Sequence, residues 1–119
     1  MAAIFEKAGE LGRLVGQSDE YQALRRAHES VRDESELRSQ MDELAGLAQQ
    51  IEDSVGRQEE PPAEAVERYN ALLGTIQAHA EYQRVVAAQS NFDKLMLKVD
   101  EQIREGIKAG AQSRIITLG

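Results

Sequence analysis

The 119-residue sequence contains no cysteine and no tryptophan, only two prolines, and only three tyrosines and two phenylalanines. Without cysteine the chain can form no disulfide bond, no thiolate metal site and no cysteine nucleophile. A core with so few rings has to be built from Leu, Ile, Val, Met and Ala. Because proline is scarce and helix-favouring residues are common, the composition favours an all-α protein.

Basic clusters are also missing, and the formal net charge is −7. Proteins that bind nucleic acid usually carry a basic patch or stripe. The nearest candidate here is the pair Arg25-Arg26, which has acidic residues close on both sides. We therefore predict no direct contact with nucleic acid, and we interpret the acidic excess as a source of solubility.

Long apolar runs are absent as well. The N-terminal stretch MAAIFEKAGELG contains two glutamates, where a signal peptide has a basic start followed by an uninterrupted apolar segment. No apolar run approaches the roughly 20 residues that a membrane span needs. We expect a cytoplasmic protein without membrane insertion.

Apolar residues recur at helical spacing almost everywhere, and no segment shows the strict alternation of a half-buried strand. Breaks near Ser18, Ser35 and Pro61-Pro62, and a further break near His79, divide the chain into about five helices. We predict an all-α fold, an antiparallel helical hairpin or bundle of about five helices with coiled-coil-like packing. The first two helices are expected to form a short hairpin, and the last helix to run from about 79 to 109.

One helix carries a heptad pattern. Apolar residues alternate at steps of four and three from Leu37 to Val55, the pattern that packs helices side by side. So small a chain cannot bury every such row, and we therefore predict a homodimer or larger assembly. The residues predicted to lie at the oligomer or partner interface are Leu37, Met41, Leu44, Ile51, Phe92, Met96, Val99 and Ile103. The alternative for each is a place in the core of one chain.

The predicted domain organisation is simple. Residues 1–112 form one helical domain with a hairpin turn near 57–62, and residues 113–119, SRIITLG, form an apolar C-terminal tail. The tail is interpreted either as a frayed end that docks on its own core or as a short peptide that inserts into another protein.

The tripeptide Glu-Tyr-Gln occurs twice, at Glu20 to Gln22 and at Glu81 to Gln83. Each copy follows a break, so each is predicted to begin a helix, with its Glu in the first turn beside the positive end of the helix dipole. The Tyr then begins the inner face. Duplication of a helical unit and independent origin of a good helix start both remain open.

No catalytic motif is found. The two histidines, His28 and His79, lack the Glu three residues earlier that a di-iron bundle requires, and HExxH is absent. Phosphate-binding glycine motifs and G-x-S-x-G are absent too. We predict no catalytic residue, no cofactor and no metal site, and hence no enzyme.

The order of these features resembles the YlbF/YmcA family of small bacterial helical proteins. The stretch SDEYQALRRAHESVRDESELRSQMDEL is similar to that family's early helices. After the proline turn, the last helix opens with Glu81-Tyr82 and continues through Ala88, Phe92 and Leu95. The resemblance covers about residues 4 to 108.

This resemblance implies a regulatory or adaptor protein that acts in cell-fate decisions or mRNA processing. Its partners would be a second copy, a related helical protein or a ribonuclease complex. Some members hold iron–sulfur clusters through cysteines, which this chain lacks. The alternatives are a self-assembling structural or chaperone-like helical protein and, second, a metal-dependent sensor.

Overall fold

A computed structural model describes the backbone of residues 2–118 and the side chains of residues 2–112. It confirms the all-α prediction, because this part of the chain contains no strand. The five helices are α1 (Ala2–Gly16), α2 (Asp19–Asp33), α3 (Ser35–Gly56), α4 (Ala63–Gln77) and α5 (Ala80–Leu118).

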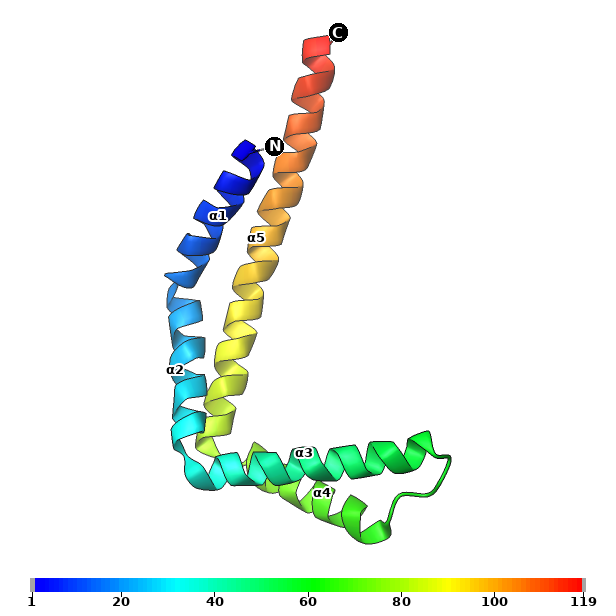
Figure 1. The fold of residues 1–119 in the computed structure, drawn as a ribbon. Helices are drawn as coiled ribbons and strands as arrows, with labels where there is room; N and C mark the ends of the chain where they lie inside the picture. The colour runs from blue at the N-terminus through cyan, green and yellow to red at the C-terminus, as the bar shows by residue number, and fades with distance from the viewer. Residues whose placement is uncertain (1, 119) are drawn as a thin grey trace.

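The helices form two arms that meet at a corner (Figure 1). In the long arm, α1 and α2 follow one another along α5. In the short arm, α3 and α4 make an antiparallel hairpin that crosses the long arm at a steep angle. The chain measures 69 × 37 × 22 Å along its principal axes. Most of its side chains therefore lie close to the surface.

The prediction that the first two helices form a hairpin is wrong. Figure 1 shows α1 and α2 nearly in line, and it is α5 that packs along α2. Only Gln17 and Ser18 separate the two helices. The side-chain amide of Gln22 donates a 2.8 Å hydrogen bond to the carbonyl oxygen of Gly16, the last residue of α1. This bond ties the end of α1 to the first turn of α2.

The second Glu-Tyr-Gln copy builds the same joint between α4 and α5. The side-chain amide of Gln83 donates a 3.1 Å hydrogen bond to the carbonyl oxygen of Gln77, the last residue of α4. Both bonds reach six residues back across a two-residue linker. The repeated tripeptide thus begins a helix, as predicted, and its Gln also holds the end of the preceding helix.

An additional acceptor completes each joint. The hydroxyl oxygen of Ser18 accepts a hydrogen bond from the backbone N–H of Tyr21, and Nδ1 of His79 accepts one from the N–H of Glu81. First-turn N–H groups have no partner within their own helix, so these bonds help to define where α2 and α5 begin.

The turn between α3 and α4 lies where the proline pair predicted it. Gln58 has a φ of 61°, a left-handed conformation that reverses the chain after α3. The N–H of Glu59 then donates a 2.9 Å hydrogen bond to the carbonyl oxygen of Ser54. Pro62 precedes the first residue of α4, where its missing N–H costs no helical hydrogen bond.

Two small hydrophobic clusters hold the arms. In the long arm, Leu24 and Ala27 of α2 pack on Ala88 of α5. The second cluster lies in the short arm and at the corner, where Leu37 of α3 packs on Leu72 and Ile76 of α4. Half-buried side chains from α2, α3 and α5 surround this second cluster: Val31, Met41, Leu44, Leu47 and Tyr82.

Near the C-terminal end of α3, the buried residues differ from those that the heptad pattern predicted. Ser54 is only 4% exposed, whereas the neighbouring Val55 is 61% exposed. On α4, similarly, Leu72 is buried and the adjacent Leu73 is only half-buried. Each helix carries two adjacent apolar rows, and the packing of α3 on α4 decides which row is buried.

The prediction that the last helix ends near Ala109 is also wrong, because α5 continues to Leu118. No proline interrupts this segment, and Gly106 and Gly110 are accommodated within the helix. The proposed docking of the tail SRIITLG concerns side chains that lie outside the described residues, so it stays a prediction.

Leu37→Ala tests the assignment of the corner. We expect it to lower the free energy of unfolding by about 2–5 kcal/mol, because it leaves a cavity among Leu72, Ile76 and their neighbours. The measurement is urea denaturation followed by circular dichroism. Val55→Ala, on the exposed side of the same helix, serves as control and should change stability by less than about 0.5 kcal/mol. Equal losses in both variants would show that the buried side of α3 is misassigned.

Candidate interaction surface

The predicted interface residues on α3 mostly build the short arm itself. Leu37 is fully buried against α4, and Met41 and Leu44 pack around the same cluster. Ile51 is half-buried further along the helix. These four side chains therefore stabilise a single chain, and a contact with a partner at these positions stays a prediction.

The predicted interface residues on α5 pass from buried to exposed along the helix. Phe92 packs on the long-arm cluster and on Tyr21, with ring centroids 5.7 Å apart. Val99 is half-buried, but Met96 is 39% exposed and Ile103 is 47% exposed. The row that begins as the core of the long arm thus ends as surface.

The length of α5 explains this change. At about 1.5 Å per residue its 39 residues span about 58 Å, whereas the 15 residues of α2 cover only about 22 Å of it. Beyond α2, the neighbour of α5 is α1, and the two helices stand apart. Leu11 of α1 faces Val99 and Ile103 across a groove of about 390 Å³.

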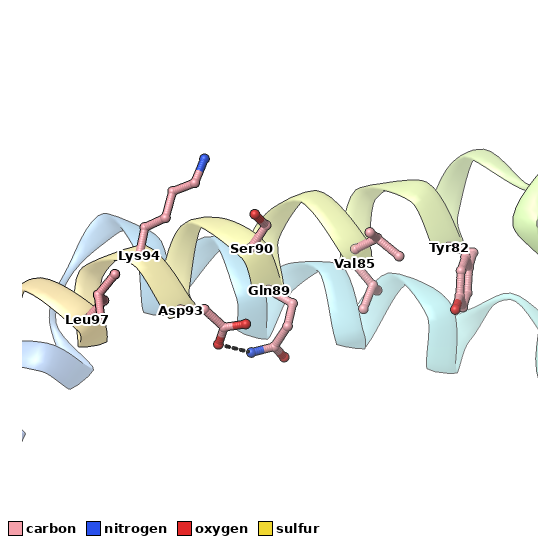
Figure 2. Close-up of a pocket in the computed structure, with 8 residues that line it drawn as sticks. Tyr82, Val85, Gln89, Ser90, Asp93, Lys94 and Leu97 are labelled. Carbon is pink, nitrogen blue, oxygen red and sulfur yellow. Dashed lines mark hydrogen bonds between the residues drawn. The ribbon is translucent and has the colours of Figure 1, made fainter.

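A second open groove, of about 590 Å³, runs along α5 alone (Figure 2). Tyr82 and Val85 line the end nearer the corner, and Leu97 lines the other end. Between them a hydrogen bond joins the side chains of Gln89 and Asp93. The floor of the groove is therefore apolar at both ends and polar in the middle.

All the exposed large apolar residues described on α5 lie on one side of the helix. At about 100° per residue they fall within a sector of about 120°, centred roughly a right angle away from the side that packs on α2. We call this surface the free face of α5, and its residues are Val86, Met96, Leu97, Ile103 and Ile107. One of these residues, Ile103, also lines the groove that faces Leu11 of α1.

Three residues of the free face were not among the predicted interface residues: Val86, Leu97 and Ile107. A four-three alternation does connect this side of the helix, and it runs from Tyr82 to Ile107. Three of its positions, however, hold Gln89, Asp93 and Asp100. These polar residues conceal the row in the sequence, although in the structure Gln89 binds Asp93 and Asp100 binds Arg104.

The charge of the chain is concentrated in the short arm. Residues 34–68 hold 10 of the 21 acidic residues but only 3 of the 14 basic residues, so this segment carries −7, the net charge of the whole chain. The remainder of the chain, which contains the long arm, is neutral. An apolar surface on a neutral arm can approach another copy of itself without strong repulsion.

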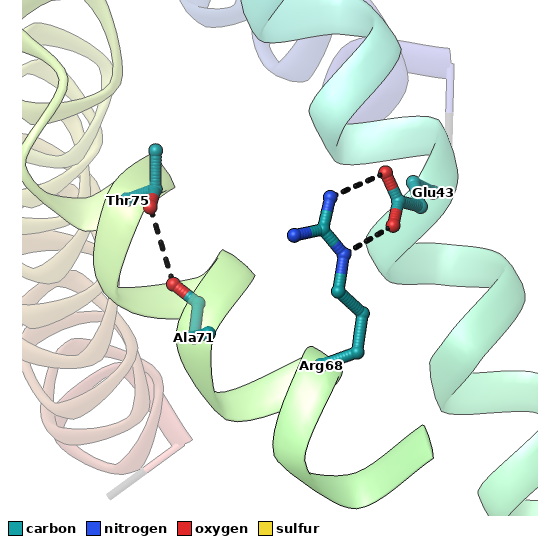
Figure 3. A network of polar contacts seen from close by, with 4 residues as sticks. All are labelled: Glu43, Arg68, Ala71 and Thr75. Carbon is teal, nitrogen blue, oxygen red and sulfur yellow. Dashed lines mark hydrogen bonds and ion pairs between the residues drawn. The ribbon is translucent and has the colours of Figure 1, made fainter. Parts of the chain in front are cut away.

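One ion pair links the two helices of the acidic arm (Figure 3). The guanidinium of Arg68 on α4 donates two hydrogen bonds to the carboxylate of Glu43 on α3, at 2.6 and 3.1 Å. These hydrogen bonds hold the pKa of Glu43 below its ordinary value, against the opposing effect of desolvation. Both side chains are about half exposed, so the pair fixes geometry more than it adds stability.

The histidines are separated in the structure. His28 is exposed on α2, and His79 caps α5. Among the described residues, no group of three or more His, Asp or Glu side chains is placed to hold a metal ion. Within the same residues, every helix falls short of the length and apolarity that a bilayer crossing requires.

Comparison with known proteins supports the resemblance seen in the sequence. The sequence model of one family, described as control of competence regulator ComK, YlbF/YmcA, matches residues 4–108. No curated protein and no solved structure matches the chain. The family match covers all of α1 to α4 except the first residues of α1, and most of α5.

The Glu43–Arg68 pair gives a pH prediction. A carboxylate whose folded pKa is lowered contributes stability above its unfolded pKa of about 4.3, and this contribution is lost as the pH falls through the folded pKa. Arg68→Gln should therefore raise the pKa of Glu43 toward its ordinary value, as measured by NMR titration. The stability difference from the unmodified chain should shrink below about pH 4. Arg26→Gln, on α2, is the control, and an equal shift in that variant would refute the pairing.

Proposed function

Because the chain belongs to the YlbF/YmcA family, which is described by its control of the competence regulator ComK, we propose that it is a non-enzymatic cytoplasmic regulator that acts by binding other proteins. The family description gives the regulatory role. The mode of action proposed here rests on the shape and surface of this chain.

The observation that carries the proposal is the extended, open shape. The radius of gyration is 21.9 Å, whereas a compact domain of this length has a value of about 13.5 Å. Active sites usually enclose most of a small ligand in a pocket. The hollows on α5 are instead open grooves along a helix, a shape that suits a helix from another protein.

The charge distribution restricts the kind of target. Residues 34–68, which make up most of the short arm, carry the full −7 charge, and a phosphate backbone would be repelled by them. An effect on mRNA processing, which the family resemblance implies, would therefore be exerted through a protein such as a ribonuclease or a related helical protein. The chain would then modulate an enzyme without contacting RNA itself.

A chaperone-like role is the second candidate. Exposed apolar side chains on α1 and α5, such as Phe5 and Leu97, could also hold unfolded clients. A client-holding surface would act on many unrelated proteins, whereas a regulator binds few partners with defined stoichiometry. Suppression of aggregation of several unrelated proteins by the purified chain would favour this candidate.

The regulatory proposal predicts an effect on RNA that the chain cannot produce alone. In the host, deletion of the gene should shift the ends of a defined set of transcripts, as mapped by sequencing of RNA ends. Expression of the unmodified chain should restore them. The purified chain incubated with the same transcripts should leave them intact, because it supplies no catalytic group.

Two results would contradict the proposal. RNA cleavage by the purified chain would make it an enzyme. Unchanged transcripts and unchanged competence in the deletion strain, together with no protein recovered in fixed stoichiometry on the tagged chain, would remove the regulatory role. Leu37→Asp, which places a charge in the corner cluster, serves as the unfolded control and should fail to restore the transcripts.

A further inference from the structure

The chain exposes far more surface than a protein of its mass normally does. Its accessible surface is 9083 Å², whereas a compact monomer of 13.2 kDa exposes about 6,400 Å². The excess is about 2,700 Å². If half of this excess were covered on each of two chains, the interface would bury about 2,700 Å² in total, which is in the range of permanent homodimers.

The apolar part of this surface is concentrated on the long arm. The exposed residues of the free face of α5 (Val86, Met96, Leu97, Ile103 and Ile107) are spread over about six helical turns. Ile4 and Phe5 at the beginning of α1 are exposed as well. The long arm is neutral, so two copies of it can meet without the repulsion that two acidic short arms would produce.

We propose that the free face of α5 is the dimerisation surface of this protein, and that it packs on the same face of a second copy with the two α5 helices antiparallel. The two-fold axis crosses the helix between Met96 and Ile103. This inference does not rest on the proposed regulatory function, and either can fail without the other.

The polar residues of the face determine the direction. In a parallel homodimer each seam position faces its own copy, so Asp93 would lie opposite Asp93 and Asp100 opposite Asp100. Facing like charges are destabilising. An antiparallel pair removes Asp93 from its own copy and brings it toward the end of the seam that holds Arg104. Only Asp100, which lies near the axis, stays close to its copy, and its charge is paired with Arg104 of its own chain. It also places the two acidic short arms at opposite ends of the dimer.

The exposed apolar contacts are tested by Leu97→Glu. Leu97 is 59% exposed in the single chain, so the substitution should leave the helix content unchanged by circular dichroism. In sedimentation equilibrium, the dimer dissociation constant should rise at least about tenfold, because a carboxylate is buried without a partner. Val55→Glu makes the same change at a similarly exposed position on the short arm and should leave the dissociation constant unaltered.

The proposal is overturned if the unmodified chain stays a monomer in sedimentation equilibrium even at about 100-fold the concentration used to compare the variants. It is also overturned if the Leu97→Glu dimer dissociates no more readily than the Val55→Glu dimer. Should Leu97→Glu lose helix content, Leu97→Ser replaces it. That variant removes the apolar contact without adding charge, and it should still weaken the dimer.

The direction is tested by single cysteines, because the natural chain contains none. In the antiparallel dimer, the two copies of residue 86 lie about 30 Å or more apart, since the axis is at least ten residues away. Val86→Cys should therefore form no disulfide under mild oxidation, whereas one of Met96→Cys, Asp100→Cys or Ile103→Cys should form one. A disulfide in Val86→Cys would overturn the antiparallel arrangement, because only a parallel pair brings the two copies of residue 86 together. No disulfide at any of the four positions would overturn the placement of the axis.

Discussion

The length of α5 is the constraint on which the rest of the molecule depends. A helix of 39 residues cannot be covered by the partners that a chain of 119 residues can supply. α2 covers its first part, where Ala88 and Phe92 find apolar neighbours. α1 stands apart from its second part and leaves an open groove beside Val99. The open surface is thus a consequence of the architecture, in which one helix is much longer than the others.

The joints keep this architecture rigid with few residues. Two linkers of two residues each connect α1 to α2 and α4 to α5, and in both a glutamine holds the end of the preceding helix. At the corner, Leu37 of α3 packs on Leu72 and Ile76 of α4. The small clusters and the joints together fix two arms of different character, one neutral with an apolar face and one acidic. A regulator with such arms can assemble through one and present the other to its target.

Much of this fold could be predicted from the sequence, because helix starts and apolar spacing are local signals. Ser18, the proline pair and the Glu-Tyr-Gln copies mark real boundaries. The choice between adjacent apolar rows could not be made, because Ser54 is buried and Val55 exposed only through the position of α4. The prediction that α1 and α2 form a hairpin was wrong for the same reason. The spacing of apolar residues indicates which face of a helix is buried, but it does not indicate which other helix covers that face.

The interaction surface was only partly foreseen. Met96 and Ile103 were predicted as interface residues because they continue the apolar row that begins at Phe92. Val86 and Ile107 belong to a row that Gln89, Asp93 and Asp100 interrupt, and Leu97 lies beside it. Polar residues in such a row count against burial when only the sequence is considered. In the structure the side-chain amide of Gln89 donates a hydrogen bond to the Asp93 carboxylate. The apolar residues on either side lie on one face because of their helical spacing.

Amide hydrogen exchange along α5 is the most direct test of the proposal that another copy covers the second half of this helix. A bare helix end opens easily and its amides exchange fast, whereas a packed one is protected. If a second copy covers this half of α5, the amides of residues 96–107 are protected as strongly as those beside Ala88, and this protection falls on dilution. Fast exchange of residues 96–107 at every protein concentration would contradict it.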